Sequence, residues 1–268
     1  MIIALSGSRG FIGSHLREMF ESQGHSVHAI DRDLLYSPYA LESYLQKIHP
    51  SVIIHAAAYG NMASHDDEDE VFDANVTKTY TLLQASYSIP YTHFLFISSS
   101  SVSLPVQTLY SATKSASEKL CIFFRQQGKN IGIVRPYTII GPREPSEHLT
   151  PKLVRSCLYM EEMPFVKEPH HDFLDVRDLC SAIGILIQQE KLPTITPIGS
   201  GISRSNLEIL QEIELLTKRK ANIQEVQKLR DFDTEHWVAD ISTIKELGWR
   251  QQYSLQQTLE DMIEYEKD

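Results

Sequence analysis

The stretch IIALSGSRGFIG, residues 2–13, decides the fold. Residues 2–6 predict a short buried strand, and Gly7, Gly10 and Gly13 follow it at three-residue spacing. We expect a helix directly afterwards, because residues 11–23 have an amphipathic pattern. A strand, a tight glycine turn and a helix N-terminus suit a pyrophosphate group, since backbone amides then point at the anion with no side chains in the way. Glycines at this spacing also form ordinary strand-to-helix turns, so the surrounding sequence has to decide.

Short apolar runs alternate with longer amphipathic segments through the first half of the chain. The runs are rich in β-branched and aromatic residues and predict strands buried on both faces, at residues 26–30, 51–57, 93–98 and 131–135. Between the strands lie helical patterns, over residues 11–23 and 71–87. This alternation predicts an α/β fold with a doubly wound parallel sheet.

The regular alternation stops after residue 135. Six prolines between residues 136 and 169 interrupt it, and one helix is expected near 149–160. The pattern returns with HDFLDV at 171–176, a helix through residue 187 and a strand at 194–199. The remaining chain predicts helices, which start at Ser205 or Asn206, near Asp240, and after Ser254.

Composition excludes several classes of function. The formal charge is −10 and no Lys/Arg cluster exceeds KRK at 218–220, which disfavours a nucleic-acid partner. No run approaches the ~18 apolar residues of a membrane span, and the start has no basic flank, so we expect a soluble cytoplasmic protein without a membrane partner. The three cysteines and eleven histidines show no ligand spacing, so neither a disulfide framework nor a metal site is predicted. The acidic run HDDEDE, 65–70, is interpreted as the solvated first turn of a helix.

Asp31 closes the second predicted strand, 18 residues beyond Gly13. A carboxylate there accepts hydrogen bonds from the adenosine ribose hydroxyls and repels a 2′-phosphate, which favours NAD. Arg32, the next residue, and Arg9 of the glycine turn are suited to pair with that phosphate. NADP therefore stays open as the alternative cofactor, as does the interpretation of Asp31 as a simple turn residue.

Tyr110 and Lys114 lie four residues apart in LYSATKSASEKL, so they share one face of the predicted helix. Taken alone, the pair is also compatible with a phenol that packs along a lysine stem.

These motifs occur in one order along the chain. Read from the N-terminus, they are the glycine triplet, HAAA at 55–58, DANVTKT around Asn75, FISSSSV at 96–102, YSATK at 110–114, RPYTIIGPR at 135–143, HDFLDVRDLCSAI at 171–183 and ADISTIKELGW at 239–249. The series resembles the extended short-chain dehydrogenase/reductase superfamily, specifically its NAD-dependent epimerase/dehydratase branch that acts on sugar nucleotides. The resemblance implies a Rossmann-type sheet over residues 1–140 and 171–199, with a substrate-binding region over 141–170 and 200–268.

The resemblance also implies roles for single residues. Tyr110 would be the general acid/base. Lys114 would bind the nicotinamide ribose and, together with the cationic nicotinamide of the oxidised cofactor, lower the phenol pKa. Ser99 would bind the reacting sugar oxygen, with Ser100 as the alternative because four serines follow one another. The cofactor would be held, in addition to the residues already named, by Phe11, Ile12, Ala56, Ala57 and Asn75.

This chain departs from the resemblance on the substrate side. The sugar 4,6-dehydratases carry Asp-Glu where this sequence has Ser100 and Ser101, so a dehydratase is disfavoured. The remaining substrate-binding candidates are Thr138, His148, His171 and Arg230. The first three differ from the residues usual in UDP-sugar epimerases, whereas Arg230 matches a family position that contacts the diphosphate. Arg143 and Lys152 would supply further charge or be ordinary surface cations.

The leading hypothesis is therefore NAD(P)-dependent hydride transfer at a sugar carbon, by an epimerase or a 4-ketoreductase. Two alternatives remain, namely a nucleotide-binding regulatory module without catalysis and an oxidoreductase that acts on a non-nucleotide alcohol or ketone. A homodimer through the helices around 71–87 and 110–127 is also expected from the resemblance.

Overall fold

The computed structural model describes residues 1–227 and 237–267. The chain divides into two compact units, the first formed by Met1–Pro136 and Ala182–Thr196, the second by Tyr137–Ser181 and Pro197–Asp268. Arg230 lies outside the described residues. The division falls near the predicted residue 140, but the returning segment of the first unit is shorter than the predicted 171–199. The tasks assigned to the two parts stay predictions.

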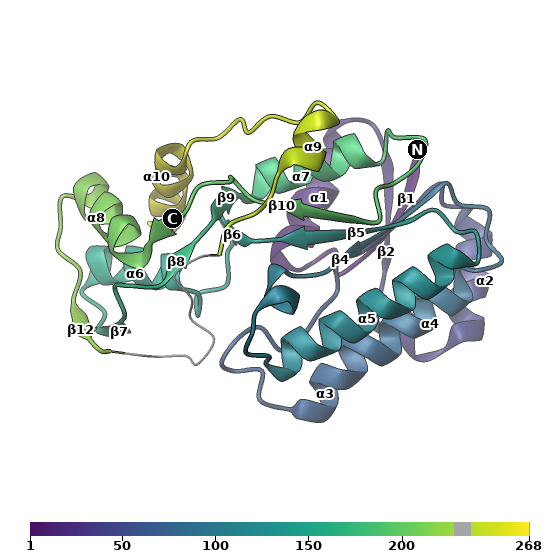
Figure 1. The fold of residues 1–268 in the computed structure, drawn as a ribbon, viewed down its shortest axis with the longest axis horizontal. Coiled ribbons are helices and arrows are strands. Elements are labelled where there is room, and N and C mark those ends of the chain that lie inside the picture. Colours follow the sequence, from purple (N-terminus) through teal and green to yellow (C-terminus); the bar gives the residue numbers. More distant parts are fainter. Residues whose placement is uncertain (228–236, 268) are drawn as a thin grey trace. The chain divides into compact units, whose positions relative to one another are not determined.

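Six strands form the central sheet, in the order β10-β5-β4-β3-β1-β2 (Figure 1). Their bounds match the predicted strands closely: β1 (Ile2–Ser6), β2 (Ser26–Ile30), β3 (Val52–His55), β4 (His93–Ile97), β5 (Ile131–Pro136) and β10 (Ile195–Ile198). Strand β1 pairs in parallel with both β2 and β3, so the order reverses there. In sheets of this kind ligands bind outside the carboxyl ends of the strands at that point. The predicted α/β class with a doubly wound sheet is confirmed.

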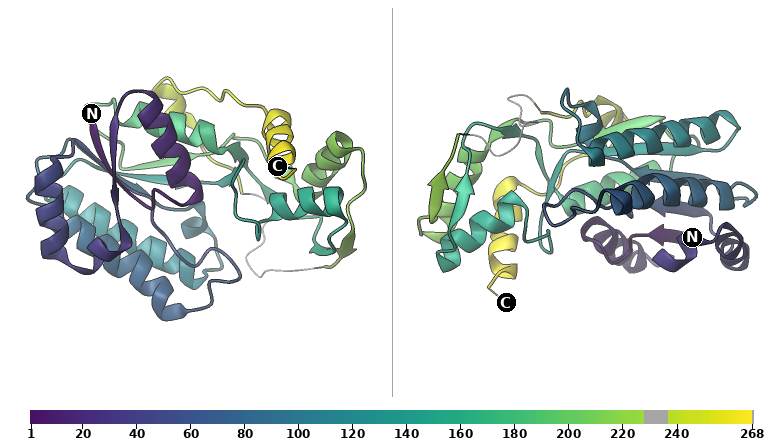
Figure 2. Two further views of the ribbon diagram at one scale, coloured as in Figure 1. Left: turned by 180° about the vertical axis from the view of Figure 1, so that it is seen from behind. Right: turned by 90° about the horizontal axis from the view of Figure 1, so that it is seen from below.

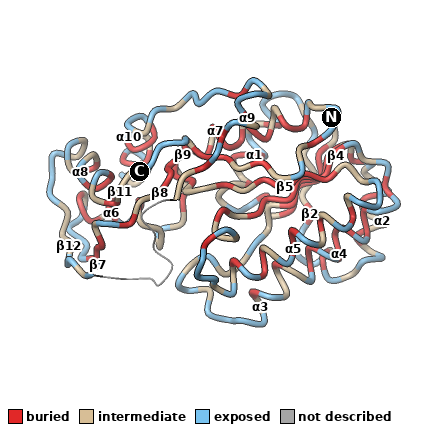
Figure 3. Tube along the Cα trace, in the orientation of Figure 1, coloured by how far each residue is buried: buried red, intermediate tan, exposed pale blue. Residues whose placement is uncertain are grey.

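Helices pack on both faces of the sheet (Figure 2). Those of the first unit are α1 (Phe11–Ser22), α2 (Pro38–Ile48), α3 (Glu68–Phe72), α4 (Lys78–Ala85) and α5 (Leu109–Gln126), with 3₁₀ helices at Arg32–Tyr36 and Ser100–Ser103. One core joins α2, α4 and α5 to the sheet through alternate strand residues such as Ile53, Phe94 and Ile133. The strand residues that alternate with these, such as Ile54 and Leu95, face the other side of the sheet and are also fully buried. Figure 3 shows the burial of the sheet strands. The continuous apolar runs of the sequence follow from burial on both faces.

Two helical segments differ from the sequence prediction. The expected helix over 71–87 begins at Glu68 and is interrupted by a π-helical turn at Asp73–Thr77. Helix α2 was not predicted, although Ser37 caps it and Pro38 occupies its first turn. Its short length and only two fully buried leucines, Leu41 and Leu45, give it a weak periodic signal.

The second unit has its own core. Its strands are short and lie in pairs, β6 (Thr138–Ile140) with β9 (Phe173–Asp175), β7 (Met163–Phe165) with β12 (Ile223–Glu225), and β8 (His170–His171) with β11 (Arg204–Ser205). Its helices are α6 (Leu149–Tyr159), α8 (Asn206–Thr217), α9 (Ser242–Glu246) and α10 (Leu255–Tyr265), and α7 (Val176–Leu186) crosses the division. Apolar residues of α6, α8 and α10 form one cluster with β6, β7 and β9.

Two helix starts predicted from the sequence are confirmed in this unit. Ser205 caps α8 and Ser254 caps α10, each with a reciprocal bond from the residue three positions on. All three cysteines are free and buried. Within the described part of the chain, none of the helices has both the length and the apolar character needed to cross a membrane.

Candidate active site

The glycine turn after β1 has no room for side chains. Gly7 has φ +72°, and a Cβ there would lie 2.6 Å from the backbone nitrogen of Ala57. A Cβ on Gly13 would lie 2.0 Å from the carbonyl oxygen of Gly7, which also accepts a hydrogen bond from the Gly10 amide. Helix α1 starts without a side-chain cap, so its first amides are left for another acceptor. The turn therefore has the backbone geometry of a pyrophosphate cradle.

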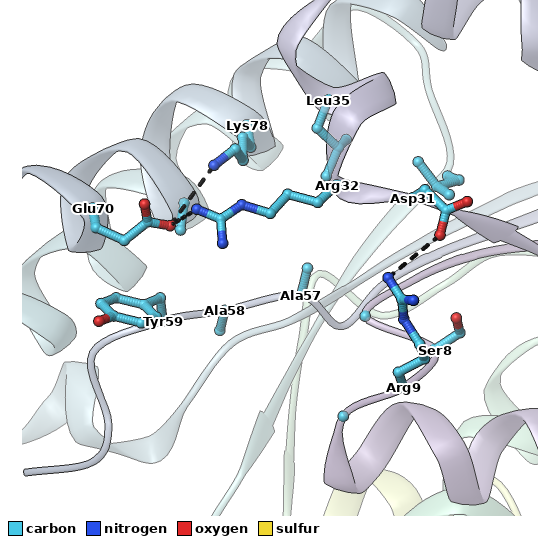
Figure 4. Close-up of a pocket in the computed structure, with 14 residues that line it drawn as sticks. Ser8, Arg9, Asp31, Arg32, Leu35, Ala57, Ala58, Tyr59, Glu70 and Lys78 are labelled. Carbon is cyan, nitrogen blue, oxygen red and sulfur yellow. Dashed lines mark hydrogen bonds and ion pairs between the residues drawn. The ribbon is translucent and has the colours of Figure 1, made fainter. Parts of the chain in front are cut away.

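A pocket opens beside this turn (Figure 4). Four segments of the first unit line it, namely the glycine turn, the end of β2 with the following 3₁₀ helix, the chain after β3, and the helical segment from α3 to α4. The lining residues are Gly7, Ser8, Arg9, Gly10, Ile30, Asp31, Arg32, Leu35, Ala57, Ala58, Tyr59, Glu70, Ala74 and Lys78. Tyr110 and Lys114 aside, five of the predicted cofactor-binding residues do not line this pocket. They are Phe11, Ile12, Gly13, Ala56 and Asn75.

Charged groups in the pocket are paired. Asp31 lies 3.7 Å from a guanidinium nitrogen of Arg9, and both side chains are well exposed. Arg32 donates a hydrogen bond to Glu70, and the Tyr36 hydroxyl and Glu70 both raise its pKa. Neither arginine is thus left with an unopposed charge, which weakens the case for NADP.

Ser99 and Tyr110 contact each other at the end of β4 and the start of α5. Ser99 caps the 3₁₀ helix Ser100–Ser103, and its hydroxyl also lies 2.8 Å from that of Ser101. Burial raises the pKa of the half-buried Tyr110 phenol to about 12, and a hydrogen bond with Ser99 opposes that shift. This contact favours Ser99 over Ser100 as the residue that shares a ligand with Tyr110. Without cofactor, desolvation dominates and the phenol pKa is raised; its expected lowering by Lys114 together with the oxidised cofactor stays a prediction.

Lys114 is almost completely buried, with 1% of its surface exposed. Its ammonium donates a 2.7 Å hydrogen bond to the carbonyl of Ile97 and lies 4.1 Å from the centre of the Phe96 ring. Burial lowers the pKa of Lys114 to about 7. The side chain is therefore held at the end of β4 rather than in bulk water, and it is readily deprotonated.

The rest of α5 keeps this pair in place. Thr108 and Ser111 form a reciprocal cap at its start. One turn beyond Lys114, the buried Glu118 carboxylate accepts two hydrogen bonds from Arg135, at 2.9 and 2.6 Å, and one from Ser98 at 2.6 Å. A buried, bidentate ion pair of this kind is costly to break, because a single remaining charge would have no partner. It fixes α5 to the ends of β4 and β5.

Asn75 lies within the π-helical turn and is buried. Its side-chain amide donates to the Tyr59 carbonyl at 2.7 Å and to Thr113 at 3.0 Å, and its oxygen accepts from the Tyr59 amide at 3.0 Å. The side chain thus ties the loop after β3 to α5. Its predicted position toward the nicotinamide stays a prediction.

His55, at the end of β3, is fully buried and bonded to Ser6 and Thr79. Burial lowers the pKa of His55 to about 3, so the ring is neutral at physiological pH. This agrees with its interpretation as a satisfied histidine at a strand end.

Ser100, the predicted alternative to Ser99, belongs to the first unit, whereas Thr138, His148 and His171 belong to the second. Thr138 starts β6, and His171 lies in β8 with its ring packed on Phe173 at 5.7 Å between centroids. His148 directly precedes α6, and its Nδ1 lies 3.1 Å from the buried carboxylate of Glu144, whose pKa is raised by burial. Whether these residues bind a substrate stays a prediction.

Sequence reasoning missed the residues that form the far wall of the pocket. Glu70 belonged to the acidic run interpreted as a solvated helix start, and the structure confirms the helix start but turns Glu70 toward Arg32 (Figure 4). Lys78 is 4% exposed and follows the π-helical turn, which no propensity rule places. Among residues 1–227 and 237–267, no group of three His, Cys, Asp or Glu side chains suits a metal ion.

The chain is similar along its length to several known proteins. The Haloferax volcanii low-salt glycan biosynthesis protein Agl12 is 27% identical over 99% of this chain and 98% of its own length. The uncharacterized UDP-glucose epimerase YtcB of Bacillus subtilis is 27% identical over 92% of each chain. UDP-glucuronic acid 4-epimerase from Bacillus cereus, solved with UDP-glucuronic acid and NAD, matches with a TM-score of 0.90 at 23% identity, over 100% of this chain and 99% of that one.

The family model of the NAD dependent epimerase/dehydratase family matches residues 3–199, which is well over half of the chain. The family predicted from the sequence motifs is thereby confirmed. The protein belongs to the NAD dependent epimerase/dehydratase family.

Proposed function

We propose that this protein is an NAD-dependent enzyme that transfers hydride at a carbon of a nucleoside-diphosphate sugar, as an epimerase or a 4-ketoreductase. The observation that carries the proposal is the contact between Ser99 and Tyr110, with Lys114 buried one helical turn away. Ser99 offers a hydroxyl to bind the reacting sugar oxygen, Tyr110 offers a phenol to exchange its proton, and Lys114 places an ammonium nearby. The relatives named above include a UDP-glucose epimerase and a UDP-glucuronic acid 4-epimerase, which supports the same substrate class.

The first unit fits a dinucleotide. The space above Gly7 and Gly13 that a Cβ would fill is suited to a pyrophosphate, and the uncapped start of α1 supplies amides for it. Asp31, at the end of β2, is suited to the adenosine ribose. When bound, NAD supplies an acceptor and donor of hydride at its nicotinamide ring.

The chain's own residues handle the proton and the sugar oxygen. In the protein without ligand, the pKa of Tyr110 near 12 keeps the phenol protonated and makes it a weak acid, so proton exchange near neutral pH requires its pKa to be lowered. A positive charge brought near by the oxidised cofactor would favour phenolate, and Ser99 already stabilises that form through its hydrogen bond. Lys114 is placed to add an ammonium or a neutral donor, since its pKa is about 7. Ser99 would orient the reacting oxygen beside the phenol.

A 4,6-dehydratase is disfavoured by the residues next to Ser99. Ser100 is buried, and the Ser101 hydroxyl is already bonded to that of Ser99 at 2.8 Å. Neither hydroxyl has a pKa suited to remove and return the protons of a dehydration near neutral pH.

A thermal-shift panel tests the proposal. Purified protein is heated with NAD or NADP, alone and together with UDP, GDP, CDP and dTDP sugars. A ligand that binds only the folded state raises the melting temperature according to its affinity and concentration. We expect a rise with NAD and a further rise with one nucleotide class. The absence of any rise with either dinucleotide, in protein whose absorbance shows that no nicotinamide was purified with it, would refute the proposal.

Epimerase and reductase differ in what happens to the cofactor. An epimerase should purify with bound nicotinamide and show no net change at the absorbance of the reduced form during turnover. A reductase should consume reduced cofactor in proportion to product.

A regulatory module without catalysis is the second candidate, suggested by the altered substrate side with His148 and His171. The buried Lys114 argues against it, because such a side chain is costly to bury and a module without chemistry has no use for it. An oxidoreductase for simple alcohols would instead turn over substrates without a nucleotide and show no shift with any nucleoside diphosphate.

We also propose a homodimer through α4 and α5. Tyr80, Tyr87 and Phe123 are each 45–54% exposed and pack around the ring of Phe124 at centroid distances of 5.4–6.3 Å. An exposed aromatic patch of this kind favours a partner surface. Light scattering at micromolar concentration should give twice the chain mass of 30.6 kDa, and the monomer mass would contradict the proposal.

A further inference from the structure

Glu70 lines the pocket beside the glycine turn and contacts two cations there, Arg32 and Lys78 (Figure 4). Its carboxylate accepts a hydrogen bond from Arg32 and lies 3.9 Å from the ammonium of Lys78. Lys78 is further paired with Asp73 at 2.7 Å and donates to the Tyr36 hydroxyl at 3.0 Å. Glu70 is the pocket residue that links these two cations.

The position of Glu70 is fixed by its own backbone. It lies in the first turn of α3, and its amide donates a 3.0 Å hydrogen bond to the side chain of Asp67, which caps that helix. Only 24% of its side chain is exposed, whereas that of Arg32 is 57% exposed. The carboxylate is therefore the anchored partner, and the arginine side chain is drawn across the pocket toward it (Figure 4).

NAD and NADP differ by one phosphate on the adenosine ribose, with a charge near −2 at neutral pH. Arg32 directly follows Asp31 and lines the same pocket, so it is the cation best placed in the chain to meet that phosphate. Its charge is neutralised by Glu70, and Arg9 is similarly opposed by Asp31. A phosphate entering this pocket would have to displace a carboxylate from a cation and remain close to it.

We propose that Glu70 is a specificity-determining residue that favours NAD over NADP, because it holds Arg32 and Lys78 in ion pairs and keeps their charges from a 2′-phosphate. This inference rests on the proposed function, since it concerns the same dinucleotide pocket. It assigns to α3 a task separate from that of Asp31, which acts from the end of β2.

Glu70→Gln tests the inference, because it removes the charge and keeps the size of the side chain. The dissociation constants of NADP and NAD are measured by calorimetry for the full-length wild type and each variant, and the ratio of the two constants is compared. We expect the ratio to move toward NADP by about tenfold, the effect of one charge at a partly solvated site. Because Asp31 still repels the 2′-phosphate, the variant should prefer NAD less strongly than the wild type but should not come to prefer NADP.

Two further variants define the control. Glu68→Gln removes the same charge from an exposed position in the same helix turn, which does not line the pocket, and should leave the ratio within about twofold of the wild type. The double variant Glu70→Gln/Arg32→Gln restores the charge balance and should return the ratio to the wild-type value. Glu70→Ala replaces Glu70→Gln should that variant not fold.

The outcomes separate the two proposals. If neither dinucleotide binds the wild type, the proposed function fails. If NAD binds and the ratio does not change in Glu70→Gln, or changes equally in Glu68→Gln, the role of Glu70 is wrong. A wild type that prefers NADP would also overturn it.

Discussion

The glycine turn of the first unit and the histidine positions of the second unit are constrained in different ways. At Gly7 and Gly13 the neighbouring atoms are backbone, so no side chain fits without a shift of the main chain. At His148 the neighbour is a carboxylate, which another polar side chain could also satisfy. The proposed cofactor side is thus constrained by the space between backbone atoms, whereas the proposed substrate side is held by polar contacts that other side chains could make. This is the side on which the chain departs from its family resemblance.

The largest effect should come from Gly13→Ala. Its Cβ would lie 2.0 Å from the Gly7 carbonyl oxygen, so either α1 or the turn must move. We expect a loss of at least ~3 kcal/mol of stability, or loss of dinucleotide binding. Urea unfolding and NAD calorimetry measure both.

Gly184→Ala is the matched control, because Gly184 lies in α7 and its Cβ would meet only the Met19 methyl at 3.8 Å. It should be neutral or stabilising by up to ~1 kcal/mol. Equal losses in the two variants would contradict the view that atomic space at the turn decides the fold there.

Tyr110→Phe should lower turnover by about 10²–10⁴-fold, because the proton-exchanging hydroxyl is removed. Its ring remains, so the melting temperature and NAD binding should stay close to those of the wild type. Tyr80→Phe, which changes an exposed phenol on α4, serves as the control. Unchanged turnover in Tyr110→Phe would contradict the assignment of proton exchange to Tyr110.

Lys114→Met should abolish turnover and change how stability depends on pH. The pKa of Lys114 is about 7 in the folded protein, below the unfolded value of 10.5. Between these two pKa values the unfolded state binds more protons than the folded state. The free-energy cost of burying the charged lysine is therefore present in full below pH 7, and it decreases as the pH rises above 7.

The free energy of unfolding of the wild type should therefore rise relative to that of Lys114→Met between pH 7 and pH 9. The rise should be at most about 2.7 kcal/mol for a single proton. Urea unfolding of both proteins at pH 7, 8 and 9 gives the difference. A difference that is constant across this range would show that the lysine does not titrate there.

The smallest effect should come from His148→Ala, which probes the substrate side. Loss of the imidazole leaves the buried Glu144 carboxylate without that partner, at a cost of about 1 kcal/mol. We expect the KM for the sugar nucleotide to rise about tenfold while the affinity for NAD stays the same. His170→Ala, in the same unit, is the control. A change in NAD affinity instead of KM would contradict the division of tasks between the units.

Much of the fold could be predicted because its signals are local. The strand and glycine turn at residues 2–13, the capping boxes at Ser205 and Ser254, and the buried runs of the sheet all depend on residues close in sequence. Helix α2 was missed because its periodic signal is short. The π-helical turn at Asp73–Thr77 was missed because its wider winding follows from contacts of Asn75 with distant residues.

The α/β class, the glycine turn after β1 and the family could all be read from the sequence, since each follows from the order and spacing of residue types. Only the tertiary structure decided the electrostatic state of the site. The pKa of Tyr110 is raised because its surroundings exclude water, and Lys114 loses its proton readily for the same reason. The pairing of Arg32 with Glu70 joins residues 38 positions apart, so no local pattern announces it. Burial and long-range charge pairs are properties of packed chains, and they are set only when the helices have packed on the sheet.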